Sequence, residues 1–278
     1  MRAPFGERLT AAVAEHGPLC AGIDPHASLL AQWGLPVDAT GLERFAMTCA
    51  EAFAGQVAVV KPQSAFFEAH GSAGVAVLEK LIAAFAGTGT LVLADVKRGD
   101  IGSTMAAYAQ AYLADGAPLA ADAITVSPYL GFGSLDPALD LAERTGRGLF
   151  VLALTSNKEG PQVQRARGED GVAVAQAMVD EAAARNEGAT PLGSVGLVIG
   201  ATVGRAALDL SRLNGPILAP GFGAQGAGVD DLGKVFGDHL RHVLPASSRD
   251  ILRHGPDVAA LRDAALRVRD SLGVAHSL

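Results

Sequence analysis

The stretch TLVLADVKRGDIGST, residues 90–104, joins an apolar run to a cluster of charges and then to the start of a helix. Its first part, 90–97, is apolar almost throughout, which predicts a strand covered on both faces. Side chains two apart on a strand point to the same face, so Asp95 and Lys97 should project together. A helix is expected to begin near Asp100. The stretch therefore predicts a strand–helix unit with an acid and an amine at the carboxyl end of the strand.

Similar apolar runs, bounded by Gly, Pro or Asp, recur along the whole chain. They are LCAGID (19–24), VAVVKP (57–62), DAITVSP (122–128), GLFVLAL (148–154), VGLVIG (195–200), PILAP (216–220) and RHVLPAS (241–247). Apolar residues recurring every three or four positions predict helices over 42–53, 78–85, 172–182 and 258–272, ending at Gly55, Gly87, Gly188 and Gly273. Strand–helix alternation indicates an α/β fold with a parallel sheet. We expect a single (β/α)8 TIM barrel over 1–278, although the strand count alone leaves an open sheet as the alternative.

Composition limits the classes of function. The chain has 278 residues, 49% of them hydrophobic and 18% charged, which is enough apolar material for one large core. Its formal net charge is −7 and it has no run rich in lysine or arginine. A general nucleic-acid or anionic-membrane surface is therefore disfavoured, although a local cationic pocket stays open.

The sequence indicates a cytoplasmic protein. Cys20 and Cys49 form no CxxC pair and suit a reducing compartment. Charged residues break the apolar residues of 1–17, so no signal-peptide core is expected there. No apolar run approaches the roughly 20 residues that a membrane helix needs. His239 and His242 have helix-like spacing, but solvated histidines are the favoured interpretation, and no metal site is predicted.

Charged residues gather at the carboxyl ends of the first three predicted strands. Asp24 ends the first and Lys61 the second, so both should reach the barrel mouth where Asp95 and Lys97 lie. Charges near a core are costly unless they pair, and an alternating network can pre-organise a reaction. A purely structural ion pair between Asp95 and Lys97 is the alternative, and Asp100 could be a helix N-cap.

Two later segments favour an anion site. GFGAQG, 221–226, satisfies G-x-G-x-x-G but comes too late in the chain for a dinucleotide-binding first turn. It follows the seventh predicted strand, and barrels often bind phosphate with the loops after strands seven and eight. Arg249 follows the eighth strand, where a guanidinium suits phosphate, although a surface arginine is the alternative. The polar segment 156–171 is either a lid or a solvated loop.

The pattern Asp95-x-Lys97-x-x-Asp100-Ile101-Gly102-x-Thr104 resembles the signature of orotidine 5′-phosphate decarboxylases. The similarity extends from Asp24 to Arg249. Lys61-Pro62-Gln63 with Phe66-Phe67-Glu68 resembles the variant (type 2) form found in many bacteria. The resemblance implies a cofactor-free and metal-free enzyme that makes uridine 5′-phosphate and CO2 in pyrimidine biosynthesis.

The resemblance also implies a role for each matching residue. Lys97 would donate the proton that replaces the lost carboxylate, and Asp95 would lie against that carboxylate. Lys61 would complete the charged chain and contact the ribose, and Asp24 would bind a ribose hydroxyl.

Further roles follow for residues outside this group. Asp100 and Thr104 would reach into the site of a partner in a homodimer, and Ser156 would contact the pyrimidine. Gln225, Arg249 and the backbone near Gly223 would hold the phosphate.

Two rival functions remain at this point. One is a Mg²⁺-dependent sugar-phosphate lyase of the same suprafamily, which shares the Asp-x-Lys-x-x-Asp strand. The other is a nucleotide-binding barrel without activity. The charged set of Lys61, Asp95, Lys97 and Asp100 argues against it, since binding alone would not require these four charges.

Overall fold

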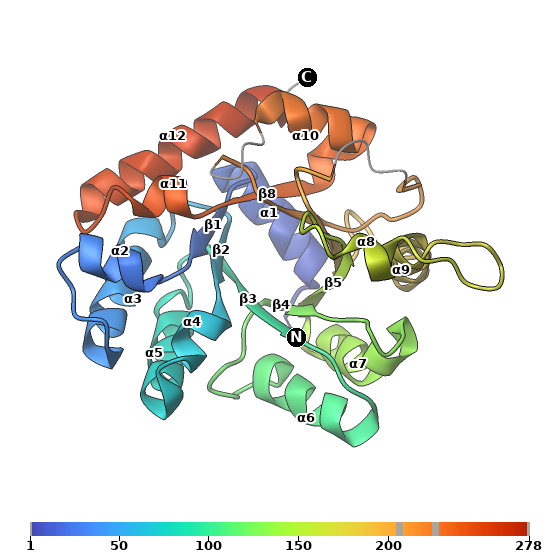
Figure 1. Ribbon diagram of the computed structural model, residues 1–278, viewed down its shortest axis with the longest axis horizontal. Coiled ribbons are helices and arrows are strands. Elements are labelled where there is room, and N and C mark those ends of the chain that lie inside the picture. Colours follow the sequence, from blue (N-terminus) through green and yellow to red (C-terminus); the bar gives the residue numbers. More distant parts are fainter. Residues whose placement is uncertain (1, 204–207, 224–227, 277–278) are drawn as a thin grey trace.

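Eight parallel strands close into a barrel in the computed structural model, which describes residues 2–203, 208–223 and 228–276 (Figure 1). The strands are β1 (Cys20–Ile23), β2 (Val59–Pro62), β3 (Leu91–Arg98), β4 (Ala123–Val126), β5 (Gly148–Leu154), β6 (Val195–Ile199), β7 (Ile217–Pro220) and β8 (Val243–Ser247). Each pairs with the next, and β1 closes the barrel against β8. All eight predicted strands and the (β/α)8 barrel are thus confirmed, and the open sheet is excluded. A single domain over 1–278 stays a prediction.

Helices surround the barrel, and most of them cover its outer face (Figure 1). They are α1 (Phe5–His16), α2 (Ala27–Gln32), α3 (Ala39–Phe53), α4 (Ser64–Glu68), α5 (Gly71–Ala84), α6 (Gly102–Leu113), α7 (Asp136–Thr145), α8 (Pro161–Gln164), α9 (Val174–Arg185), α10 (Val229–Phe236), α11 (Arg249–Leu252) and α12 (Val258–His276), with 3-10 turns over Phe132–Leu135 and Gly237–His242. The four predicted helices are confirmed as α3, α5, α9 and α12. The predicted stop at Gly273 is wrong, because α12 continues to His276. A single glycine inside a helix costs only about 1 kcal/mol, so it need not end one.

The apolar residues form two clusters on the two faces of the barrel wall. Alternate strand residues such as Val92 and Ala94 join the large cluster beneath the helices. Their neighbours Leu91 and Leu93 fill the inside of the barrel together with Phe150. The strands are therefore buried on both faces, which explains their near-continuous hydrophobicity.

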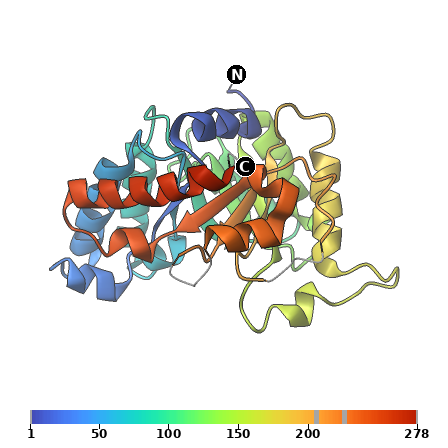
Figure 2. The same ribbon diagram turned by 90° about the horizontal axis from the view of Figure 1, so that it is seen from above.

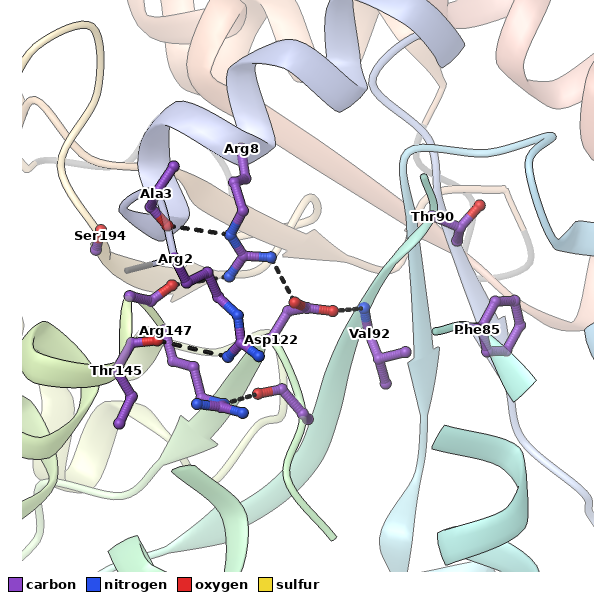
Figure 3. A network of polar contacts seen from close by, with 12 residues as sticks. Arg2, Ala3, Arg8, Phe85, Thr90, Val92, Asp122, Thr145, Arg147 and Ser194 are labelled. Atoms are coloured by element: carbon purple, nitrogen blue, oxygen red, sulfur yellow. Dashed lines mark hydrogen bonds and ion pairs between the residues drawn. The ribbon is translucent and has the colours of Figure 1, made fainter. Parts of the chain in front are cut away.

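Helix α1 closes the amino-terminal end of the barrel. Phe5 belongs to the inner cluster and meets Phe150 edge to face, with ring centroids 5.9 Å apart. Arg8 pairs with Asp122, whose other carboxylate oxygen accepts a hydrogen bond from Val92 N (Figure 3). Figure 2 shows α1 on one side of the barrel and the segment carrying α8 on the other. The site chemistry described below lies at the end opposite α1.

No helix among the described residues is long and apolar enough to cross a membrane.

Candidate active site

Strand periodicity brings the predicted charged residues to the inner face of the barrel mouth. On β3, Leu91 and Leu93 point inward, and Asp95 and Lys97 follow at the same two-residue spacing. Lys61 follows inward-facing Val59 on β2 in the same way. The change from apolar to charged residues along these strands therefore marks where the packed core ends and the mouth begins.

The four predicted charges lie in one network. Asp95 is its centre: Lys61 Nζ lies 3.1 Å from Oδ2, and Lys97 Nζ lies 2.5 Å from Oδ1. Asp24 Oδ1 lies 3.8 Å from Lys61 Nζ and has no hydrogen-bond partner among the described residues. The side chains of Lys61 and Asp95 are each 9% exposed, whereas that of Lys97 is 44% exposed. Lys97 is therefore the lysine of this network that reaches the open mouth.

The two buried members of the network are held in their charged forms. Burial raises the pKa of Asp95, but Lys61, Lys97 and hydrogen bonds lower it by more, so its pKa falls to about 2. Burial likewise lowers the pKa of Lys61, but Asp24 and Asp95 outweigh it, and that pKa lies above its ordinary value. At neutral pH the Asp95 carboxylate and the Lys61 ammonium are therefore both charged, and they lie on the buried side of Lys97.

Two further residues belong to this network, and neither of them was assigned a role from the sequence. Thr125, buried on β4, donates from Oγ1 to Asp95 Oδ1 over 2.8 Å. Gln63 follows Lys61 at inward spacing, and its amide suits Asp95 in the orientation that turns the nitrogen toward Oδ2, where it can donate a hydrogen bond. Thr125 could have been found from its position, because it is a polar residue two positions after the inward-facing Ala123.

The backbone of β3 departs from a regular strand at Lys97. Its φ is +45°, and the pairing of β3 with β4 shifts register between Ala94 and Arg98. Regular alternation predicted the contact between Asp95 and Lys97 but not this kink.

Asp100, Thr104 and Ser156 make no hydrogen bond or ion pair with the charged network among the described residues. The half-buried Asp100 accepts a hydrogen bond from Ile101 N over 2.7 Å. The N-cap of α6 is Ile101, so the helix-cap interpretation of Asp100 is wrong. Thr104 is exposed in the first turn of α6, and Ser156 is exposed after β5, against Gly200 at the end of β6.

The predicted phosphate segments after β7 and β8 meet. Gly223 has a φ of +78°, and a Cβ placed there would lie 2.2 Å from Asp250 Oδ2. The positive φ favours glycine, and the position packs the β7 loop against the side chain of the residue that follows Arg249. Arg249 is exposed and makes no side-chain hydrogen bond or ion pair with the described residues. Gln225 lies outside the described residues.

A cleft of about 620 Å³ lies between the loop after β4 and the segment 156–171. Its lining includes Ser127, Tyr129, Asn157 and Val163. The segment itself is mostly exposed, as both interpretations of it require.

Comparison with known proteins decides between the rival families. The model described as the orotidine 5′-phosphate decarboxylase / HUMPS family matches residues 17–264. The chain belongs to this family. A relative from Salinispora arenicola named orotidine 5′-phosphate decarboxylase is 64% identical over 95% of each chain, and one of that name from Streptomyces coelicolor is 62% identical over the same shares.

Solved structures of family members agree in fold. A Streptomyces avermitilis crystal structure is 59% identical, covers 100% of this chain and 97% of its own, and superposes with a TM-score of 0.97. The Leishmania donovani OMP decarboxylase is 29% identical, covers 99% and 100%, and gives a TM-score of 0.75. The Mg²⁺-dependent lyase finds no support among these relatives. No cluster of three or more potential metal ligands occurs in 2–203, 208–223 or 228–276.

Proposed function

We propose that this chain is an orotidine 5′-phosphate decarboxylase of pyrimidine biosynthesis in which Lys97 is the proton donor. The bond between C6 of the pyrimidine and its carboxylate breaks, CO2 leaves, and the electron pair stays on C6. The Lys97 ammonium then gives C6 a proton, which yields uridine 5′-phosphate. The observation that carries the proposal is the half-exposed Lys97 ammonium held 2.5 Å from the buried carboxylate of Asp95.

The charges behind Lys97 support this chemistry. Asp95 stays ionised next to the space that the substrate carboxylate would occupy, so it favours loss of that negative group. The ammonium of Lys97 stabilises the negative charge that develops on C6, and Lys61 keeps Asp95 in place. Because these groups are fixed before the substrate arrives, little reorganisation is needed in the transition state. The free acceptor of Asp24 suits a ribose hydroxyl.

Remote binding of the phosphate would hold the ring against these charges. Arg249 offers a guanidinium without a protein partner among the described residues, beside the glycine loop that includes Gly223. We assign the phosphate to Arg249, Gln225 and this loop, and the pyrimidine contact to Ser156. Binding energy from the phosphate can then be used to close the segment 156–171 over the site.

We further propose a homodimer in which Asp100 and Thr104 serve the partner's site. Ile101, Tyr129 and Leu130 are large apolar residues that are 62%, 78% and 53% exposed. They lie on the loops after β3 and β4, which pack together. Exposed large apolar side chains support an interface here, and Ile101 lies next to Asp100 and three residues before Thr104 in the chain. The free buried thiols of Cys20 and Cys49 support a cytoplasmic location.

A spectrophotometric assay tests the function. Orotidine 5′-phosphate should lose its ultraviolet absorbance when the purified chain is added, and exhaustive chelation should leave the rate unchanged, because the chemistry is assigned to protein charges. Activity that is lost on chelation and restored by Mg²⁺ would point to the sugar-phosphate lyase class instead. A chain that binds uridine 5′-phosphate but turns over no orotidine 5′-phosphate would be the silent binding barrel.

A further inference from the structure

The kink at Lys97 places the proposed proton donor in a backbone conformation that disfavours a side chain. Lys97 and Asn214 are the described non-glycine residues with positive φ, at +45° and +40°. Such a conformation persists when its surroundings fix it, and it is typical of functional sites. What fixes Lys97 therefore also sets the position of its ammonium.

A hydroxyl from the neighbouring strand is hydrogen-bonded to the backbone at the kink. Thr125 Oγ1 accepts a hydrogen bond from Lys97 N over 3.0 Å and donates one to Asp95 Oδ1 over 2.8 Å. The Lys97 ammonium donates to the same Oδ1. These three hydrogen bonds form a closed ring that runs from the Lys97 backbone N–H through the Thr125 hydroxyl and the Asp95 carboxylate to the Lys97 ammonium.

The direction of the Thr125 hydroxyl is determined by its partners. The ionised Asp95 carboxylate can only accept, so the single hydroxyl hydrogen must point to it. A lone pair is then left for Lys97 N–H. Thr125 is 1% exposed, so water cannot easily replace either bond.

A second tie between the strands lies just beyond the kink. Ser127 N donates to Arg98 O over 2.8 Å, and this backbone contact does not involve Thr125. The pairing of β3 with β4 can therefore survive loss of the Thr125 hydroxyl, while the ring at Lys97 cannot.

We propose that Thr125 is a positioning residue for the decarboxylation, whose hydroxyl sets the Lys97 ammonium relative to the Asp95 carboxylate. The inference rests on the proposed role of Lys97. The proposed function and the role of Thr125 are contradicted by different results. An inactive wild-type chain would contradict the proposed function. An active wild type with an equally active Thr125→Val variant would contradict only the role of Thr125.

Isosteric replacement tests the role. Thr125→Val should lower kcat by about 10- to 100-fold, the scale of misplacing a catalytic group, and leave the affinity for uridine 5′-phosphate near that of wild type. Thr125→Ser should recover kcat to within a few fold, because it restores the hydroxyl.

The matched control is Thr90→Val. Thr90 is also a buried threonine next to β3, but its hydroxyl donates to Val57 O at the opposite end of the barrel. This control should lose stability without losing kcat.

The pH profile separates positioning from a general loss of stability. Among the described residues, the charges that face Asp95 are Lys61 from β2 and Lys97 from β3, with Asp24, directly after β1, beyond Lys61. The Thr125 hydroxyl favours the ionised carboxylate, so the acid limb of kcat/KM should move to higher pH in Thr125→Val.

Three results would overturn the inference: wild-type kcat in Thr125→Val, a serine variant as impaired as the valine variant, or an equal loss of kcat in Thr90→Val. If Thr125→Val does not fold, Thr125→Ala and Thr125→Ser ask the same question, since they differ only by the hydroxyl oxygen. Equal kcat in that pair would overturn the inference as well.

Discussion

A single buried carboxylate, Asp95, joins the two lysines of the barrel mouth. Lys61 holds it from the side of the core, and Lys97 meets it from the open side. An unpaired charge at such depth would be costly, so each member of the network depends on the others. The same arrangement that keeps Asp95 ionised leaves one ammonium directed toward the substrate.

The pKa of Asp95 predicts how its contribution to stability changes with pH. The pKa is about 2 in the folded chain against an ordinary value of 3.8, so the folded state favours the ionised form. This stabilisation is fully present above pH 3.8 and is lost as the pH falls through about 2. Asp95→Asn removes it. The difference in unfolding free energy between wild type and variant should be flat from pH 7 to 5 and shrink by about 1.5 kcal/mol by about pH 2.5.

Denaturant unfolding at each pH makes the measurement. Asp180→Asn, which neutralises an exposed carboxylate on α9, is the matched control and should show a nearly constant difference. A difference between wild type and Asp95→Asn that stays constant down to pH 2.5 would mean that Asp95 is not held in its ionised form.

Sequence periodicity predicted much of this network, and particular residues show where it stops. Two-residue spacing was enough to place Asp95 and Lys97 together, because both follow an unbroken apolar strand. The backbone at the Lys97 kink is hydrogen-bonded to Thr125, which lies 28 residues later and is brought next to β3 by the pairing of β3 with β4. A local pattern carries no signal for such a contact.

At the scale of elements, two strand ends build the proposed phosphate site. At Gly223 the loop after β7 lies against the Asp250 side chain of the segment after β8, and a φ of +78° favours glycine there. The order of the strands made this meeting predictable, since β7 and β8 are neighbours in a barrel. The positive φ of Gly223 was not predicted.

Arg249→Ala tests the remote binding of the phosphate. The variant should lose about 2–5 kcal/mol in kcat/KM for orotidine 5′-phosphate, the scale for removing one partner of a charged contact. It should react normally with orotidine, which has no phosphate to lose. Free phosphite should partly activate the wild type toward orotidine, because it fills the vacated phosphate region. Steady-state rates with the nucleotide and the nucleoside make the comparison.

Arg253→Ala is the control, since it removes the same charge four residues later, where the side chain is 59% exposed and 3.9 Å from Asp250. It should leave both substrates nearly unaffected. An equal loss for nucleotide and nucleoside in Arg249→Ala would mean that Arg249 does not act through the phosphate.

At the scale of the whole molecule, the barrel leaves Asp100 without a role in its own charged network. Eight apolar runs made the closed barrel predictable, because each strand is buried on both faces. The proposed interface between two chains has a weaker signal in the sequence, and its support is the exposed apolar side chain of Ile101, next to Asp100 in the chain, with those of Tyr129 and Leu130. The proposed dimer therefore needs a test of its own.

Subunit exchange provides that test. Homodimers of Lys97→Ala and of Asp100→Ala should each be inactive. If Asp100 acts in the partner's site, a mixed dimer of the two variants has one site with both defects and one site with neither. Random exchange makes about half the dimers mixed, so roughly a quarter of wild-type activity should return. Lys97→Ala mixed with Lys61→Ala is the control and should recover nothing, because both residues serve their own chain. No recovery with Asp100→Ala, despite demonstrated exchange, would confine Asp100 to its own subunit.

The role of Lys97 is most directly tested by turnover of orotidine 5′-phosphate in the Lys97→Ala variant, with binding of uridine 5′-phosphate measured in parallel by calorimetry. Lys80→Ala, which removes a 57% exposed lysine paired with Glu43, is the matched control and should keep full activity. We predict that Lys97→Ala binds uridine 5′-phosphate through the phosphate contacts but produces none from orotidine 5′-phosphate. Near-normal turnover in Lys97→Ala would contradict its assignment as the proton donor.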